Sequence, residues 1–509
     1  MIYKGLYHLF YQYNPNGSVW GNIVWAHSTS KDLINWSHHK PAIYPSQPAD
    51  KLGCWSGSAT ILPDGKPAIL YTGINPQNQQ VQNIAFPKDL SDPYLVEWEK
   101  SPSNPLMAPT TSNKINASSF RDPTTAWLGS DGMWRVIIGS KIDRMGMAIL
   151  YRSKDFLQWE KAEHPLHSAK DTGMWECPDF FPVSTNSDMG LDTSKNGANV
   201  KYVFKVSLDD TRKEYYTIGT YDSSKDIYMP AEGSIEYDTG LRYDNGKFYA
   251  SKTFFDSAKN RRILWGWINE SSTVDHDVKK GWSGVQAIPR SILLHKSGKQ
   301  LVQWPVKEIE NLRHGQVDVP NMVLKGGTKV KVSGVTAAQA DIDISFQVKN
   351  LEKAENFDSN HAHPQDLCIH MVASAKGAIG PFGIMALASE NLEEYTSVFF
   401  RILKDHNNSH VVLMCSDQSS SSLDKSNDMA NYGVILDIDP TKEKLSLRTL
   451  IDHSIIESFG GNGLGCITAR VYPTKAIEDE AHLYVFNYGE EDVQVSSFSA
   501  WNMKKAQIN

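Results

Sequence analysis

WSGSATIL at 55–62 is followed by three stretches that loosely repeat it: FRDPTTAWL at 120–128, WECPDFFPV at 175–183 and YASKTFFD at 249–256. Each is a short strand pattern rich in aromatic and β-branched residues, and turn signals rich in Gly, Pro and Asp separate such patterns. A spacing of roughly 55 to 70 residues is typical of four-stranded propeller blades with long loops. We therefore predict that residues 1–305 form a β-propeller.

Polar residues at equivalent points of these repeats are expected to meet. The innermost strands of all propeller blades line one central channel, so equivalent positions converge on one pocket. Ser56, Asp122 and Glu176 occupy such positions. The repeat pattern thus predicts a polar site on the propeller axis.

The second half of the chain has a different pattern of apolar and polar residues. Residues 331–509 alternate apolar and polar residues in strand fashion, as in ADIDISFQV at 340–348. This alternation predicts an antiparallel β-sandwich, so the expected fold class is all-β. The helix-like VKEIENLR at 306–313 and the Gly- and Lys-bearing residues after it lead us to predict a linker over 306–330.

Length and composition bound the possible functions. A chain of 509 residues exceeds what one hydrophobic core normally supports, which predicts two domains. The net charge is −7 and the basic residues are scattered, which argues against a nucleic-acid or anionic-membrane partner. A neutral substrate fits better. The many aromatic residues could bind the apolar faces of sugars or could simply fill strands.

Two acidic residues stand in aromatic, proline-restricted sequence rather than in a solvated charged run: Asp122 in Phe-Arg-Asp-Pro and Glu176 in Trp-Glu-Cys-Pro-Asp. Taken singly, each could be an ordinary turn residue. Hydrolysis of a glycoside with retention needs a carboxylate nucleophile and a second carboxyl group that acts as acid and then as base. Burial and the nearby Asp179 could raise the pKa of Glu176 for the acid role, and Arg121 is expected to keep Asp122 ionised.

Longer motifs resemble the plant cell-wall members of glycoside hydrolase family 32, the acid invertases and fructan exohydrolases. The similarity spans nearly the whole chain. Besides the repeats quoted above, it rests on YHLFYQYNP at 7–15, WGNIVWAHS at 20–28, SKTFFDSAKNRRILWGW at 251–267, LVQWPVKEIE at 301–310 and IDHSIIESFG at 451–460.

The resemblance implies a five-bladed β-propeller followed by a β-sandwich, with no metal or cofactor. It implies that Glu176 is the acid/base and that Asp122 stabilises the transition state. The residues implied to line the fructosyl pocket are Gln12, Trp20, Trp55, Ser56 and Arg121. Inner-strand packing is the alternative reading of these side chains.

The family nucleophile has no counterpart in this sequence. It is the Asp of a W-M-N-D-P-N-G motif that lies just before the strand matched by Met1–Gly5, and no other N-D-P occurs in the chain. Because the acid/base alone cannot form the glycosyl-enzyme intermediate, we expect little or no hydrolysis by the chain as printed. Either the sequence is a truncated form of an active enzyme, or the product binds sugar without cleaving it.

The substrate is expected to be sucrose. In KVSLDDTR at 205–212, Asp209 and Arg212 resemble an acid and a base that hold the glucose side of sucrose in invertases, and exohydrolases typically lack the acid. A carboxylate fixed by a cation can bind two glucose hydroxyls. The alternatives are a fructan exohydrolase, a non-catalytic sugar-binding or regulatory protein, and for this pair an ordinary surface ion pair.

Export to the cell wall is expected from the resemblance, although the sequence opens on a strand pattern rather than a secretory leader. In an exported protein Cys368 and Cys415 could form a disulfide; otherwise they are two buried thiols. The N-x-S/T sequons, which are candidate glycosylation sites, are Asn16, Asn35, Asn116, Asn269 and Asn407. We expect a monomer that binds sucrose or short fructans, with a proteinaceous invertase inhibitor as a possible further partner.

Overall fold

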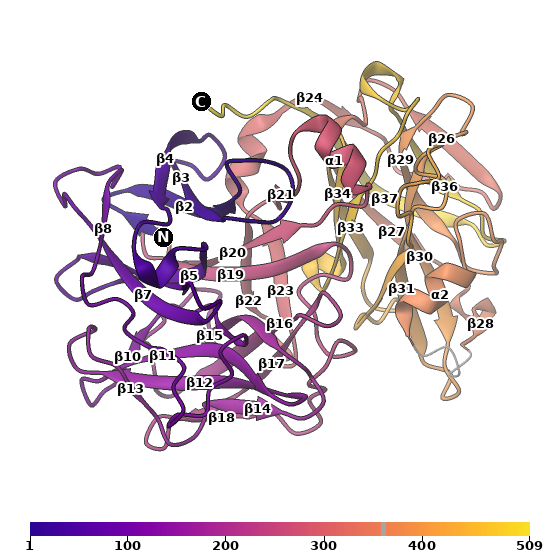
Figure 1. Cartoon of the computed structure of the whole chain (residues 1–509). Helices are drawn as coiled ribbons and strands as arrows, with labels where there is room; N and C mark the ends of the chain where they lie inside the picture. Colours follow the sequence, from indigo (N-terminus) through magenta and orange to yellow (C-terminus); the bar gives the residue numbers. More distant parts are fainter. Residues whose placement is uncertain (358–362) are drawn as a thin grey trace.

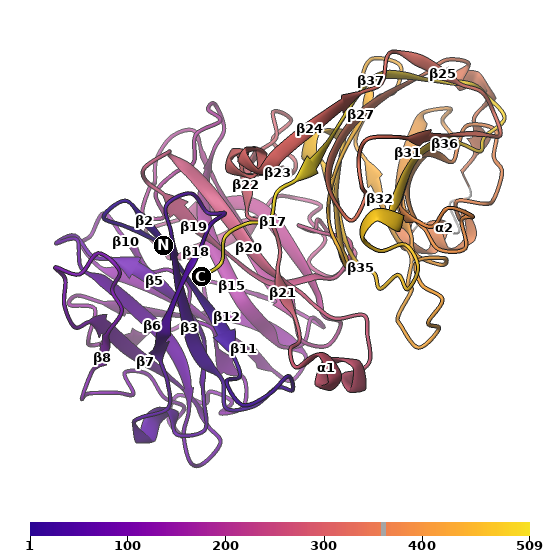
Figure 2. The same ribbon diagram turned by 90° about the horizontal axis from the view of Figure 1, so that it is seen from above.

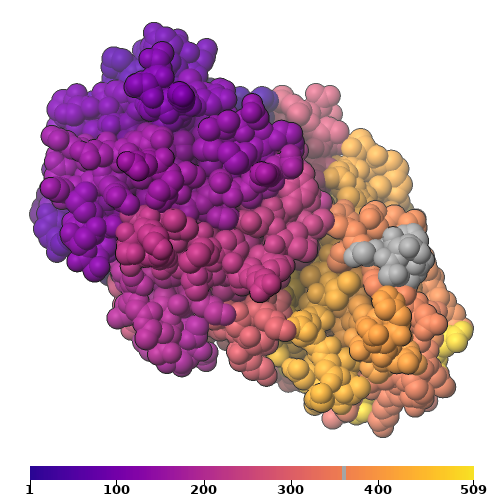
Figure 3. Space-filling view, turned by 90° about the horizontal axis from the view of Figure 1, so that it is seen from below, coloured from indigo at the N-terminus to yellow at the C-terminus, as the bar shows by residue number. Residues whose placement is uncertain are grey.

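The computed structural model describes residues 1–357 and 363–509. It is built almost entirely from β-strands, which form two domains that pack against each other (Figure 1, Figure 2 and Figure 3). The first domain is a five-bladed propeller and the second is a β-sandwich, which confirms the predicted fold class.

The five blades are antiparallel sheets, numbered here I to V in chain order. Blades I and II contain β1 (Ile2–Tyr3), β2 (Leu6–Tyr13), β3 (Val24–Ser30) and β4 (Ser37–Ile43), then β5 (Cys54–Ile61), β6 (Pro67–Ile74), β7 (Gln80–Pro87) and β8 (Trp98–Lys100). Blade III contains β9 (Phe120–Arg121), β10 (Trp127–Leu128), β11 (Trp134–Ile142), β12 (Met145–Ser153), β13 (Glu160–Lys161) and β14 (His167–Ala169). Blades IV and V contain β15 (Trp175–Ser184), β16 (Val200–Leu208), β17 (Lys213–Asp222) and β18 (Ile227–Pro230), then β19 (Phe248–Asp256), β20 (Arg261–Ile268), β21 (Val285–Gln286), β22 (Arg290–Leu294) and β23 (Leu301–Pro305).

Apolar packing between neighbouring blades closes the ring. Strand β6 is buried along its whole length because blades cover both of its faces. Where the last blade meets the first, Tyr7 and Ile34 of blade I pack against Ile263 of blade V. The Tyr7 hydroxyl also donates a hydrogen bond to Asp256 Oδ2 at 2.9 Å. Blade I therefore closes the propeller, and the first strands of blades II to V face one another around its axis.

The sandwich consists of two mainly antiparallel sheets around one large apolar core. One sheet contains β24 (Arg313–Asp318), β25 (Met322–Leu324), β27 (Gln339–Val348), β33 (Leu445–Asp452), β34 (Ile455–Gly460), β35 (Gly465–Arg470) and β37 (Val493–Met503). The other contains β26 (Thr328–Val332), β28 (Glu355–Asn356), β29 (Phe382–Ala388), β30 (Thr396–Lys404), β31 (His410–Asp417), β32 (Tyr432–Leu436) and β36 (His482–Asn487).

The predicted linker over 306–330 is wrong for most of its length. Residues 307–312 form a short 3-10 helix, and β24 and β25 then pair with β37 while β26 pairs with β36. These are strands with mostly exposed side chains, so their sequence lacks the apolar alternation of a buried strand. The sandwich thus begins before residue 331.

Helices are few and short in the described part of the chain, and none is long and apolar enough to cross a membrane. Helix α1 (Val274–Lys280) begins after Thr273, whose side chain accepts the backbone N–H of His276. Helix α2 (Pro364–His370) carries Cys368, which forms a disulfide with Cys415 of β31. The sandwich is therefore cross-linked at the pair that we gave as a possible disulfide.

A buried charge network joins the two domains. Arg290 of blade V donates to Asp244 Oδ2 at 3.0 Å within the propeller and to Glu457 Oε2 at 2.7 Å in the sandwich. Thr468 of the sandwich donates its hydroxyl to Asp244 at 2.6 Å. All four side chains are buried, so the network fixes how the domains sit against each other.

Candidate functional site

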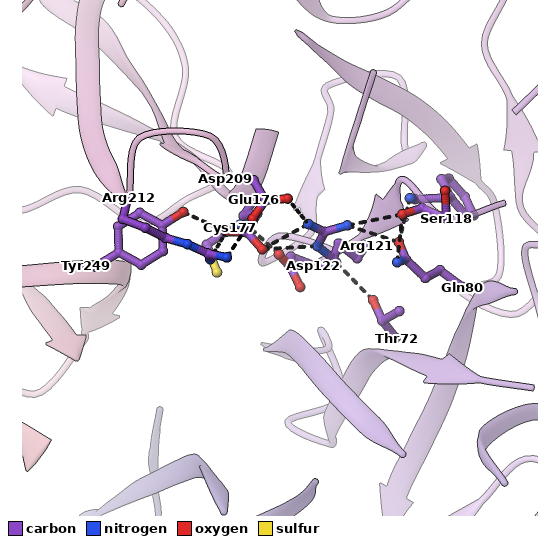
Figure 4. Close-up of polar contacts among 11 residues, drawn as sticks. Thr72, Gln80, Ser118, Arg121, Asp122, Glu176, Cys177, Asp209, Arg212 and Tyr249 are labelled. Carbon is purple, nitrogen blue, oxygen red and sulfur yellow. Dashed lines mark hydrogen bonds and ion pairs between the residues drawn. The ribbon is translucent and has the colours of Figure 1, made fainter. Parts of the chain in front are cut away.

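Asp122 lies directly after β9 and is buried at the propeller axis. Its backbone is in the left-handed region, with φ 68°, and its N–H donates to Thr72 Oγ1 at 2.9 Å. The backbone N–H of Cys177 donates to Asp122 Oδ2 at 2.8 Å. These bonds hold the Asp122 carboxylate against the strand that carries Glu176 (Figure 4).

Glu176 lies at the start of β15, where a bulge shifts the register between Glu176 and Asp179. Its side chain is 16% exposed. Oε1 accepts a bond from Arg121 Nη2 at 2.9 Å, and Oε2 accepts bonds from the Tyr249 hydroxyl at 2.6 Å and Arg212 Nη1 at 3.2 Å (Figure 4). Three donors from three blades therefore converge on this one carboxylate.

Opposing effects act on the pKa of Glu176, and the net effect is a rise. Burial is the largest cause and raises the pKa; the Arg121 guanidinium lowers it; Asp122 and Asp209 raise it and the Tyr249 hydrogen bond lowers it. The predicted like charge, Asp179, is not among these groups, because its carboxylate points away and accepts bonds from Thr253. A carboxyl group with a raised pKa is suited to donate a proton in mildly acidic solution.

Arg121 forms no ion pair with Asp122, and its expected role in keeping Asp122 ionised stays a prediction. The Arg121 guanidinium lies 2.9 Å from Glu176 Oε1 and 3.3 Å from Asp209 Oδ2. The side-chain oxygen of Gln80 and the carbonyl of Ser118 each accept a hydrogen bond from Arg121 Nη1 at 3.4 Å (Figure 4). Arg121 is thus a buried bridge between the acidic groups.

The predicted Asp209–Arg212 ion pair forms, with Arg212 Nη2 2.9 Å from Asp209 Oδ1. Both side chains are partly exposed, at 34% for Asp209 and 58% for Arg212. The pair lies in the turn between β16 and β17, beside Glu176. It is therefore part of the site rather than an isolated surface contact.

The other predicted pocket residues come from blades I and II. Trp20 is 67% exposed, and its ring makes an edge contact with Trp55 at 5.8 Å between centroids, so it is not packed in an inner strand. Gln12 Nε2 donates to the Cys54 carbonyl, and its Oε1 is buried without a partner in the described residues. Ser56 is half-buried in β5. An unsatisfied buried amide oxygen is available to accept a ligand hydroxyl.

Comparison with known proteins identifies the family. The model of the glycosyl hydrolases family 32 N-terminal domain matches residues 1–305, and that of the family 32 C terminal domain matches residues 308–502. The chain belongs to glycosyl hydrolase family 32. The predicted family is thereby confirmed.

Family 32 relatives include enzymes of both expected kinds. The chain is 64% identical over 515 residues to a beta-fructofuranosidase, insoluble isoenzyme CWINV1, of Arabidopsis thaliana, covering 100% of this chain and 88% of that protein. It is 61% identical over 512 residues to a fructan 6-exohydrolase of Beta vulgaris, covering 100% and 84%. The crystal structure of fructan 1-exohydrolase IIa from Cichorium intybus superposes with a TM-score of 0.97 at 50% identity, covering 100% and 94%.

Several residues that contact this candidate site or the segments that carry it were not predicted from the sequence. Tyr249 and Lys252 lie within the quoted repeat at 249–256 but carry no acidic signal, and Thr72 and Gln80 lie in strands with no recognised motif. The repeated position of YASKTFFD in the blade pattern was the one signal that could have identified Tyr249. Among the described residues, no group of three or more His, Cys, Asp or Glu side chains is arranged to hold a metal ion.

Replacing Tyr249 with Phe is expected to move the alkaline limb of the kcat/KM profile to higher pH. The Tyr249 hydroxyl stabilises the ionised form of Glu176 and so lowers its pKa; without it the pKa rises, and the protonated acid persists to higher pH. Initial rates measured across pH test this shift. The control is Tyr202→Phe, which removes a hydroxyl bound to the Lys195 carbonyl in blade IV, away from Glu176. A Tyr249→Phe limb that stays in place, or moves to lower pH, contradicts the assignment.

Proposed function

We propose that this site performs the acid/base half of a retaining β-fructofuranosidase reaction, with sucrose as the main substrate. The observation that carries the proposal is the setting of Glu176: a buried carboxyl group with a raised pKa, beside Asp122 and between the donors Arg121 and Tyr249. Names of close relatives support the reaction class.

In the proposed reaction, protonated Glu176 gives its proton to the oxygen that links the fructosyl and glucosyl units as that bond breaks. The resulting carboxylate is stabilised by Arg121, Arg212 and Tyr249, and then takes a proton from the water that releases fructose. Asp122, held by the Cys177 N–H, is placed to accept hydrogen bonds from fructose hydroxyls and to stabilise the positive charge that develops on the sugar ring.

The attacking carboxylate is not assigned to any residue of the printed sequence. The resemblance puts it in a W-M-N-D-P-N-G segment ahead of the residues matched by Met1–Gly5. Hydrolysis is therefore best assayed with that segment placed before Met1, beside the chain as printed. In the extended form we expect sucrose to be cleaved faster than inulin-type or levan-type fructans, and the reverse order would favour a fructan exohydrolase.

The Asp209→Asn variant is expected to lose activity selectively on sucrose. Asp209 is held by Arg121 and Arg212 with part of its carboxylate exposed, an arrangement suited to bind glucose hydroxyls. Loss of such charge-assisted bonds corresponds to about a 10- to 100-fold fall in kcat/KM for sucrose. Fructans, which present fructose at this position, should be affected much less.

The matched control for this variant is Asp210→Asn. Asp210 is the next residue and is similarly exposed. It forms an ion pair with Arg144 at 3.1 Å rather than with a residue of the candidate site. Its substitution should leave the rates on both substrates unchanged. Equal losses on sucrose and fructan in Asp209→Asn would show that Asp209 does not select the glucosyl group.

We also propose that the chain acts in the cell wall, because relatives at this identity include one named as a cell wall isozyme. Asn16, Asn116 and Asn407 are exposed and open to glycosylation in an exported protein. Asn35 is less suited, since its Nδ2 donates to Asp32 and its Oδ1 accepts the Gln507 N–H.

A further inference from the structure

The ammonium group of Lys252 joins four of the five blades. Lys252 is in β19 of blade V. Its Nζ donates to the Pro178 carbonyl in blade IV at 3.0 Å, to Ser58 Oγ in blade II at 3.2 Å and to the Pro123 carbonyl in blade III at 3.4 Å. Two of these acceptors belong to the segments that carry Asp122 and Glu176.

We propose that Lys252 is a positioning residue that sets the placement of the Asp122 and Glu176 carboxylates relative to each other. Pro123 directly follows Asp122, and Pro178 is two residues after Glu176. One ammonium therefore tethers both segments at once. This inference rests on the proposed function, which gives the two carboxylates their roles.

The backbone at these segments needs such support. Asp122 has φ 68° and Cys177 has φ 44°, both in the left-handed region that L-residues rarely adopt. The bond from Cys177 N–H to Asp122 Oδ2 depends on this conformation. A second lysine, Lys205, donates to the Cys177 carbonyl at 3.2 Å, so two lysines hold the consecutive carbonyls of Cys177 and Pro178.

The partners of Lys252 distinguish it from an ordinary structural cation. Lys205 forms an ion pair with Glu214 at 2.7 Å. Within residues 1–357 and 363–509, by contrast, no carboxylate forms an ion pair with Lys252, and its ammonium donates to two carbonyls and one hydroxyl. Burial lowers the pKa of Lys252, and the nearby Asp179 and Asp122, which make no ion pair with it, oppose that fall. The clearest effect of Lys252 is therefore to fix the positions of the backbone segments whose carbonyls it binds.

The test compares Lys252→Met with Lys252→Gln in the form of the chain that carries the segment ahead of Met1. Met removes the donors but keeps the chain length, and misplacing the carboxylates is expected to lower kcat for sucrose about 100-fold with little change in KM. Gln restores N–H donors toward the carbonyls and should recover part of the lost kcat. A melting curve of each variant shows whether it is folded.

The matched control is Arg262→Met. Arg262 is a buried cation in the neighbouring strand β20 that likewise binds hydroxyls and a carbonyl, those of Thr253, Thr193 and Leu191, away from the carboxylates. The Arg262→Met substitution should lower the stability of the fold without lowering kcat. If Arg262→Met and Lys252→Met reduce kcat equally, or if Gln recovers nothing in a folded protein, Lys252 is only a structural residue.

A crystal structure of Lys252→Met decides the placement without any activity assay. We expect the Asp122–Pro123 and Cys177–Pro178 segments to separate and the 2.8 Å contact between Cys177 N and Asp122 Oδ2 to be lost. An unchanged contact would overturn the inference. Failure of the unsubstituted protein to cleave any fructoside would instead count against the proposed function, so the two failures are distinguishable.

Discussion

Glu176→Gln, made in the form of the chain that carries W-M-N-D-P-N-G before Met1, is expected to lower kcat for sucrose by about 10³-fold, within the usual range for loss of a general acid/base. The amide keeps the shape of the side chain, and its single oxygen can accept from either Arg121 or Tyr249, but it has no acidic proton to give to the leaving oxygen. KM should change little, because the fructosyl contacts proposed for Asp122 and Gln12 remain. Measuring kcat, KM and the pH profile checks this, since the limb that reports Glu176 should vanish.

The control is Glu310→Gln. Glu310 is also a partly buried glutamate beside arginines, 3.5 Å from Arg448 and 3.6 Å from Arg313, but it lies at the start of the sandwich. Its substitution should leave kcat unchanged. If Glu176→Gln kept more than about a tenth of the activity, the acid/base would be another residue.

The Arg290→Met variant should reduce the free energy of unfolding by about 3–5 kcal/mol, the usual loss when one partner of a buried ion pair is removed. Met fills part of the space but leaves Asp244 and Glu457 buried without their cation. Because Glu457 belongs to the sandwich, docking of the two domains should weaken as well. Urea unfolding measures the loss, and limited proteolysis between the domains reports the weakened docking.

The pH dependence of this loss has a defined sign. Burial raises the pKa of Glu457 and Arg290 opposes that rise, so removing Arg290 raises the folded-state pKa further. The folded variant then binds more protons than the unfolded chain, so its stability deficit should grow as the pH rises above 4.5, the ordinary pKa of a glutamate. Lys88→Met is the control: Lys88 forms an exposed pair with Glu97, and its loss should have no measurable effect. A deficit independent of pH would mean that packing, rather than charge, dominates.

Much of the fold was predictable from local sequence. The repeats at 55–62, 120–128, 175–183 and 249–256 are the first strands of blades II to V or lead into them, because inner strands need aromatic and β-branched residues that pack on both faces. The linker prediction failed where β26, with the sequence TKVKV, exposes nearly all its side chains. A solvated edge strand carries no apolar alternation from which to recognise it.

The sequence predicted which residues form much of the candidate site, but not which of their side chains contact one another. Asp122, Glu176, Asp209 and Arg212 were named from motifs and do converge. Which carboxylate Arg121 contacts could not be predicted, because the answer depends on the bulge after Glu176 and on left-handed backbone at Cys177. Lys252 was missed for a similar reason, since a lysine in a strand has no sequence signal that it will reach two carbonyls and a hydroxyl in three other blades.

The decisive measurement is glucose release from sucrose at mildly acidic pH, by the chain carrying W-M-N-D-P-N-G before Met1 and by the chain as printed. We expect hydrolysis by the extended form and little by the printed form, with sucrose binding in both. Hydrolysis by neither form, when both are folded and fructans are also left intact, would contradict the assignment of this site to a β-fructofuranosidase. Equal hydrolysis by both would show that the attacking carboxylate lies within the printed sequence.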